Sequence, residues 1–360
     1  MNPLRTLHDA GQSIWLDFLR RSLITDGGLA RLIREDGVTG VTSNPTIFAK
    51  AIGESSDYDG AISRIAARGR KSPVDVFYEL ALTDVRMAAD LFRPVYEQTG
   101  GTDGFVSFEL EAGLAHDATH SIAAAHDLVA RIDRPNVMIK VPGTAEGIPV
   151  VEELTAAGIN VNITLLFSVE MYEEAALAYL AGLERRLSAG DPLDRVASVA
   201  SFFVSRIDTV VDALLPDGSP LRGRVAVANA KRAYQRFLRL FSGERWARLA
   251  DAGARVQRPL WASTGTKNAA YSDVLYVEEL VGRDTVSTMP EATLEAFRTH
   301  GRVRPGAVRQ GVDEAEATLS LLAEHGIALE TITAQLLDDG LAAFDADLSK
   351  LTNIIEAKLG

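Results

Sequence analysis

The stretch NVMIKVPG, residues 136–143, decides how the rest of the sequence is interpreted. Four apolar residues flank one lysine, Lys140, and a Pro-Gly pair ends the run. A short, β-rich run bounded by turn residues is typical of a strand buried on both faces. Lysine is almost never fully buried unless it is paired or functional, and burial lowers its pKa. Lys140 is therefore a candidate nucleophile that can form a Schiff base with a carbonyl compound; the alternative is a strand-end lysine with its head in solvent.

The composition narrows the class of protein. The 360 residues are 47% apolar and 24% charged, include no cysteine and carry a net charge of −12. The absence of cysteine excludes disulfides, thiolate metal ligands and cysteine nucleophiles. The acidic balance argues against a nucleic-acid partner, and no stretch approaches the ~20 apolar residues that cross a bilayer. The N-terminus lacks the apolar core of a signal peptide, so we expect a cytoplasmic enzyme that acts on small molecules without a membrane partner.

Seven further stretches are predicted to be strands, and helical segments follow them. These strands are 13–19, 37–45, 104–110, 160–168, 196–206, 258–264 and 284–290. Eight strands that alternate with helices predict an α/β fold, a (β/α)8 TIM barrel with additional helices. A doubly wound open sheet is disfavoured, because no strand leads into a G-x-G-x-x-G turn.

The domain organisation follows from the same pattern. We find no internal repeat and no low-complexity linker, so we expect one domain over residues 1–360. Residues 300–360 form a predicted C-terminal helical extension, with helices near 312–325 and 328–358. This extension can cover the mouth of the barrel or only its flank.

Polar residues interrupt or end the first seven predicted strands. They are Asp17, Asn44, Glu109, Lys140, Asn162, Thr164, Ser201, Arg206 and Ser263. Each costs roughly 1–3 kcal/mol if it is buried without a partner, so a barrel that only had to be stable would not need them. In barrels of this kind the active site lies at the carboxyl ends of the strands. We therefore expect these side chains to form one site.

The residue types suggest roles around the lysine. Glu109 and Thr164 lie on the strands expected on either side of Lys140, where they can hold a water for proton transfer. Asp17 is a second carboxylate, free to take a proton from a substrate hydroxyl.

The remaining polar residues suit a phosphorylated sugar. Asn44 and Asn162 are neutral groups suited to sugar hydroxyls. A phosphate can be bound by Arg206 together with Ser201, and further candidates for this role are Ser263 and Lys267. The alternative for Arg206 is a surface ion pair.

Five strings resemble the transaldolase family, in its longer bacterial form. They are GVTSNPTIF, VMIKVPGTAEGI, GINVNITLLFS, SVASFFVSRID and RPLWASTGTKN, and they run in the expected order from about Asp17 to Pro290. The resemblance implies a class I aldolase-type barrel that uses no metal or cofactor. It also implies transfer of a dihydroxyacetone unit from fructose 6-phosphate or sedoheptulose 7-phosphate to erythrose 4-phosphate or glyceraldehyde 3-phosphate. This reaction belongs to the non-oxidative pentose phosphate pathway.

The resemblance also implies residue roles. By this resemblance Lys140 forms the Schiff base, Asp17 is the acid/base at the C4 hydroxyl, and the catalytic water is held by Glu109 and Thr164. The dihydroxyacetone portion is bound by Asn44 and Asn162. The phosphate is bound by Ser201 and Arg206, and Phe203 lies beside the site. Shorter relatives carry serine-aromatic-arginine after the seventh strand, whereas this chain has Ser263 to Lys267, so the second phosphate cation is assigned to Lys267. Because neighbouring residues of a strand face opposite ways, Phe202 and Phe203 cannot both point inward.

The sequence is also compatible in part with other functions. An aldolase would release free dihydroxyacetone, and a non-catalytic barrel would bind sugar phosphates as a sensor. A metal-assisted isomerase is disfavoured, since His116 and His120 have no third ligand at a metal-binding spacing. The sequence leaves a monomer and a homodimer equally open.

Overall fold

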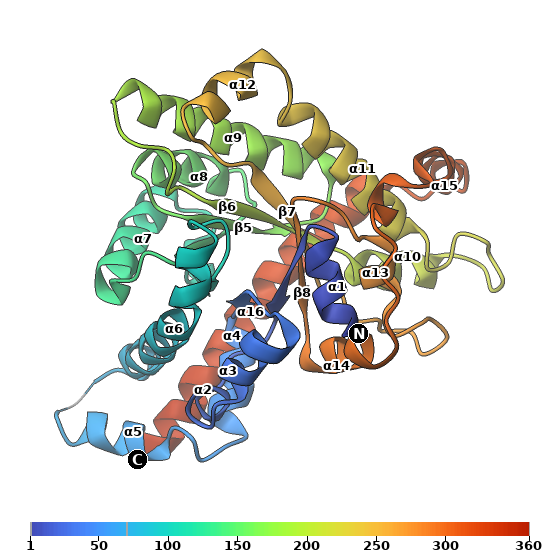
Figure 1. Cartoon of the computed structure of the whole chain (residues 1–360). Coiled ribbons are helices and arrows are strands. Elements are labelled where there is room, and N and C mark those ends of the chain that lie inside the picture. The colour runs from blue at the N-terminus through green and yellow to red at the C-terminus, as the bar shows by residue number, and fades with distance from the viewer. Residues whose placement is uncertain (1, 70, 360) are drawn as a thin grey trace.

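The computed structural model describes residues 2–69 and 71–359, and its centre is a closed barrel of eight parallel strands (Figure 1). The strands are β1 Gln12–Leu16, β2 Gly40–Thr42, β3 Phe105–Glu109, β4 Val137–Pro142, β5 Val161–Leu166, β6 Ser198–Phe203, β7 Gln257–Ala262 and β8 Thr285–Met289. Each overlaps the stretch predicted for it and is shorter. Closure comes from β1, which pairs with β8 along its whole length. The predicted (β/α)8 barrel is confirmed, and an open sheet is excluded.

Helices surround the barrel in the expected alternation. They are α1 Pro3–Asp9, α2 Arg21–Thr25, α3 Gly28–Arg31, α4 Pro45–Gly53, α5 Asp59–Ala66, α6 Pro73–Gln98, α7 Ala118–Ile132, α8 Gly147–Ala156, α9 Val169–Ser188, α10 Ser205–Leu214, α11 Val225–Leu240, α12 Gly243–Asp251, α13 Leu275–Glu279, α14 Glu291–His300, α15 Val312–Glu324 and α16 Leu329–Leu359. Within residues 2–69 and 71–359, none of the helices is both long and apolar enough to span a membrane.

Local backbone conformation and capping set where several helices begin. Gly27 has φ +75°, a left-handed conformation that ends α2 and begins α3. Helix α7 begins at Ala118, because the Asp117 carboxylate caps it by accepting from the His120 backbone N–H. Helix α4 was not anticipated; the Asn44 side chain caps it at the Ile47 N–H, and Pro45 occupies its first turn.

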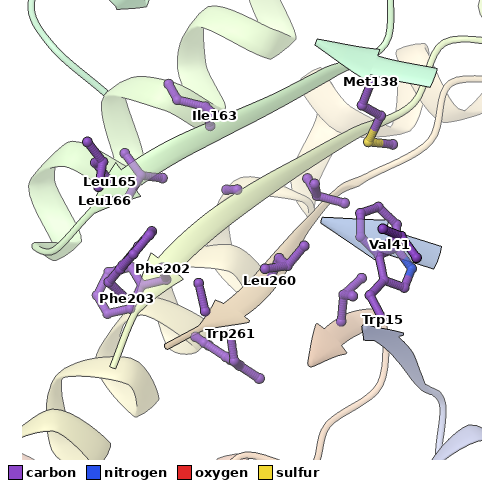
Figure 2. Packing of buried hydrophobic residues seen from close by; sticks show 14 of the residues in the cluster. Trp15, Val41, Met138, Ile163, Leu165, Leu166, Phe202, Phe203, Leu260 and Trp261 are labelled. Atoms are coloured by element: carbon purple, nitrogen blue, oxygen red, sulfur yellow. The ribbon is translucent and has the colours of Figure 1, made fainter. Parts of the chain in front are cut away.

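The strands are buried on both faces, and Figure 2 shows part of this core, with side chains from β1, β2, β4, β5, β6 and β7. The Trp15 ring lies against the backbone of β2, where a Cβ at Gly40 would come within 2.5 Å of it. Phe202 packs edge-to-face on Trp261, whereas Phe203 packs on Phe167 and lines the barrel mouth. The two phenylalanines therefore face opposite ways, as the sequence predicted.

The C-terminal segment lies partly on the flank of the barrel and partly at its mouth. Helix α15 packs on α11 in the outer ring, whereas α16 packs mainly on α4 and also contacts α6, α10 and β5. In Figure 1 α16 is the long red helix that passes beside α4 and ends near α5.

A buried carboxyl group joins α10 to α11 and α13. Asp208, 2% exposed, accepts the Ala226 backbone N–H at 2.8 Å and the Tyr276 hydroxyl at 2.9 Å. Burial is the main cause that raises the pKa of Asp208 from its ordinary value of 3.8 to about 6. Folding therefore favours the neutral acid at this position.

This pKa predicts a pH dependence of stability. Between about pH 4 and 6 the folded protein holds a proton on Asp208 that the unfolded chain has lost, so the free energy of unfolding falls as pH rises. Asp208→Asn keeps one acceptor and removes the charge. We expect the variant to gain roughly 2 kcal/mol over the wild type between pH 4 and 7. Urea unfolding of both proteins at several pH values measures the free energy of unfolding. If that free energy changed with pH equally in the two proteins, Asp208 would not titrate between pH 4 and 6.

Candidate active site

A cavity of about 530 Å³ opens at the carboxyl end of the barrel. Nine of the eleven predicted site residues line it: Asp17, Asn44, Lys140, Thr164, Ser201, Phe203, Arg206, Ser263 and Lys267. Glu109 and Asn162 lie behind this lining. Another cavity of about 550 Å³ lies in the outer ring between α11 and α15, where the buried Lys231 pairs with Glu279. The convergence of polar strand ends identifies the barrel mouth as the candidate site.

Lys140 and Glu109 form a buried ion pair. The Lys140 Nζ donates to Glu109 Oε2 at 3.0 Å and to the Ser43 carbonyl oxygen at 3.2 Å, and both side chains are 6% exposed. The two residues are direct neighbours in the register of β3 and β4. Burial raises the pKa of Glu109, and the Lys140 ammonium opposes that rise. The pair therefore places a carboxylate within hydrogen-bond distance of the lysine, where the two groups can exchange a proton.

Thr164 lies on the other side of the lysine, on β5. Its Oγ1 is buried and has no hydrogen-bond partner among the described residues. A buried hydroxyl without a protein partner is costly unless it bonds water or a ligand. The next residue, Leu165, has φ +59° at a register shift of β5. The shift lies in the pairing of β5 with β6, whereas β5 pairs regularly with β4 and places Thr164 opposite Pro142, two residues beyond Lys140.

Asp17 follows β1 directly, whereas the sequence prediction placed it within the strand. Its Oδ1 accepts the Thr42 hydroxyl at 2.6 Å, and Thr42 Oγ1 lies 2.8 Å from Thr288 Oγ1. Because Thr42 has one hydroxyl proton, it accepts from Thr288 when it donates to Asp17. Both threonines line the cavity and were missed, since a threonine in a β-branched strand carries no signal beyond strand propensity.

The two asparagines differ in what they offer a ligand. Asn44 Oδ1 accepts the Ile47 N–H at 2.9 Å as the cap of α4, so its amide N–H groups remain for the cavity. Asn162 is fully buried: its Nδ2 donates to Ser107 Oγ at 2.9 Å, and its Oδ1 accepts the Ser201 hydroxyl at 2.7 Å. The structure thus places Asn162 in support of Ser201. In this geometry Ser201 presents an acceptor, which fits a sugar hydroxyl and does not fit a phosphate oxygen.

Three cations line the cavity with no acidic partner in the described part of the chain: Arg206, Lys267 and Lys50, which the sequence prediction missed. Arg206 belongs to the first turn of α10, and its guanidinium carbon lies 5.2 Å from the Phe203 ring centroid. Burial lowers the pKa of Arg206, while Asp17 and Glu109 oppose the change. A surface ion pair is therefore excluded as the explanation of Arg206. Unpaired cations at one cavity favour an anionic ligand.

The serine after β7 is held in an unusual backbone conformation. Ser263 has φ +56°, and its Oγ lies 2.9 Å from Ser205 Oγ at the start of α10. A left-handed conformation is uncommon for serine and is more frequent at functional sites. The contact ties the loop that carries Lys267 to the turn that carries Arg206.

The C-terminal helix forms one wall of the cavity. Phe344 of α16 lies in the lining, and the next turn is anchored by a hydrogen bond from the Thr46 hydroxyl to the Asp347 carboxylate. Of the two positions that the sequence left open, the mouth is the one that α16 occupies.

No group of three or more side chains suited to hold a metal ion is found among residues 2–69 and 71–359. His116 pairs with Glu146 at 3.0 Å and His120 with Asp117 at 2.6 Å, all on the exposed surface.

Comparison with known proteins identifies the family of this chain. A family model described as "Transaldolase/Fructose-6-phosphate aldolase" matches residues 14–355. Transaldolase 1 of Streptomyces avermitilis is 48% identical over 99% of this chain and 95% of its own length. The transaldolase of Saccharopolyspora erythraea is 47% identical over 99% of this chain and 97% of its own, and that of Thiobacillus denitrificans is 45% identical over 98% and 99%. With a family match over nearly the whole chain on a closed (β/α)8 barrel, the chain belongs to the transaldolase/fructose-6-phosphate aldolase family of enzymes.

Proposed function

We propose that this enzyme is a transaldolase that works through a Schiff base on Lys140. The buried Lys140–Glu109 pair beneath a cavity with three unpaired cations carries the proposal. A lysine nucleophile suits a ketone carbonyl, and the cations suit a phosphate. The donors are fructose 6-phosphate or sedoheptulose 7-phosphate, and the acceptors are erythrose 4-phosphate or glyceraldehyde 3-phosphate.

In the first half-reaction the amine attacks the ketone carbon of the donor. Glu109 takes the proton that Lys140 loses, and a water held between Glu109 and the Thr164 hydroxyl carries protons while the carbinolamine loses its oxygen as water. Asp17 then removes the proton of the C4 hydroxyl. The C3–C4 bond breaks, its electron pair moves into the iminium group to form an enamine on Lys140, and the aldose phosphate leaves.

In the second half-reaction these steps run in reverse with a different aldehyde. The enamine attacks the acceptor, Asp17 returns its proton to the new hydroxyl, and water hydrolyses the Schiff base. Asn44 donates to the dihydroxyacetone portion, Ser201 accepts from one of its hydroxyls, and Asn162 orients Ser201. Arg206 and Lys267 bind the phosphate, and Phe203 packs beside the guanidinium.

A second candidate within the same family is an aldolase that releases free dihydroxyacetone. The relatives at 44–48% identity that are named transaldolase favour the transferase. Family likeness also supports the non-oxidative pentose phosphate pathway and a cytoplasmic location. An assay with fructose 6-phosphate, with and without erythrose 4-phosphate, separates the two activities: a transaldolase turns over only when the acceptor is present.

The Schiff base predicts a covalent adduct. Incubation with fructose 6-phosphate and borohydride should attach a reduced dihydroxyacetone unit to Lys140, detected by peptide mass spectrometry. Lys140→Ala should form no adduct and lose at least about 10³-fold in kcat, because no other amine is buried beside a carboxylate in this cavity. Lys231→Ala, at the buried lysine of the outer ring, is the matched control and should keep both the adduct and the wild-type kcat. A Lys140→Ala variant with wild-type turnover, or a folded wild type that forms no adduct, would refute the mechanism.

The unpartnered hydroxyl of Thr164 predicts opposite effects on activity and stability. Thr164→Val keeps the shape of the side chain and removes only the hydroxyl, so kcat and the rate of adduct formation should fall about 10- to 100-fold. The midpoint of thermal unfolding should stay the same or rise, since the hydroxyl has no partner to lose. Thr164→Ser, which keeps the hydroxyl, should restore most of the rate. If valine lowers the rate and serine does not restore it, the residue acts by shape and not by binding water.

A further inference from the structure

The longest helix of the chain contains a single glycine at its contact with the active site. Gly340 lies inside α16, is buried, and is the only glycine among the helix's 31 residues. Glycine is the weakest helix former after proline, so a glycine in the middle of a helix implies a packing requirement.

The contacts of Gly340 identify that requirement. A Cβ at this position would lie 2.9 Å from Leu165 Cδ2 and 3.5 Å from the nearer guanidinium nitrogen, Nη1, of Arg206. The first distance is too short for two carbon atoms, so either Leu165 or the helix would have to move. Leu165 is fully buried at the carboxyl end of β5, and its backbone is in the left-handed region (Figure 2). Because its side chain is fully packed, a Cβ at Gly340 would require Leu165 to repack or α16 to shift.

Packing is the main constraint on the position of the Arg206 guanidinium, which also lies in the field of the Asp17 and Glu109 charges. No hydrogen bond or ion pair to it is found in the described part of the chain, and its one specific contact is with the face of Phe203. A guanidinium without fixed acceptors takes its position from the surfaces around it. Here those surfaces are the Phe203 ring on one strand and the backbone of α16 at Gly340.

We propose that Gly340 is a positioning residue: it leaves room for Leu165 and Arg206, so that α16 holds the guanidinium in the orientation that binds the phosphate of the substrate. The C-terminal helix thereby sets the affinity for phosphorylated sugars without contacting the reacting carbon atoms. This inference rests on the proposed function for the identity of the substrate, but the binding of phosphate can be measured independently of turnover.

Gly340→Ala tests the proposal by separating phosphate binding from chemistry at Lys140. We expect the KM for fructose 6-phosphate and the inhibition constant of inorganic phosphate to rise about tenfold, with kcat within about twofold of the wild type. Borohydride trapping of dihydroxyacetone, which has no phosphate, should proceed at the wild-type rate. Ala343→Ser adds one heavy atom to the same helix at an exposed position and should change none of these values.

Leu165→Ala provides a second test that does not depend on how well Gly340→Ala folds. Alone, it opens space beside Gly340, next to the guanidinium, and should weaken phosphate inhibition by a few-fold. Combined with Gly340→Ala, the added methyl group occupies the space that Leu165 vacates, so the double variant should bind phosphate more tightly than Gly340→Ala. The inference is overturned if phosphate inhibition is unchanged in both single variants, or if dihydroxyacetone trapping falls as much as phosphate binding.

The same measurements keep the two proposals apart. A wild type that binds inorganic phosphate by calorimetry but shows neither transfer nor an adduct would refute the proposed function. The Gly340 variants would then still be judged by phosphate affinity alone.

Discussion

The site depends on one buried ion pair, Lys140 and Glu109. Removing two charges from water costs several kcal/mol per ion, and only good geometry recovers that free energy. The barrel provides the geometry because β3 and β4 run parallel and place the two residues side by side, with Nζ and Oε2 3.0 Å apart. Since a carboxylate without its partner would be more costly still, the pair and the register of these strands stabilise each other. The same contact sets the carboxylate where it can exchange a proton with the lysine.

Around this pair, polar groups fall into two classes. One class is satisfied within the protein: Asn162 bonds Ser107 and Ser201, and Thr42 bonds Asp17. These bonds fix the depth and direction of side chains that a ligand would meet. The other class has no hydrogen-bond partner within residues 2–69 and 71–359, and it includes the Thr164 hydroxyl and the Arg206 guanidinium. Unpaired groups in a cavity are the ones that a water, a sugar or a phosphate can satisfy.

Helix α16 forms part of the wall of the cavity at the barrel mouth. It contributes Phe344 to the lining and Gly340 to the surroundings of Arg206, although it lies more than a hundred residues away from that arginine along the chain. The candidate site at the carboxyl ends of the strands is thus completed by a helix that contains none of the predicted site residues.

The sequence alone determined the eight strands, the class of fold and most of the residues that gather at the barrel mouth. A strand buried on both faces leaves a clear apolar pattern, in which a lysine, a carboxylate or an asparagine stands out. It could not show that Thr42 and Thr288 support Asp17, since threonine is also an ordinary strand residue. It could not show that Asn162 lies behind Ser201 or that Asn44 caps α4, since those depend on which hydrogen bonds the packed chain permits. The position of α16 and the role of Gly340 depended on tertiary structure alone, because contacts between distant segments follow from how surfaces fit and leave no local pattern in the chain.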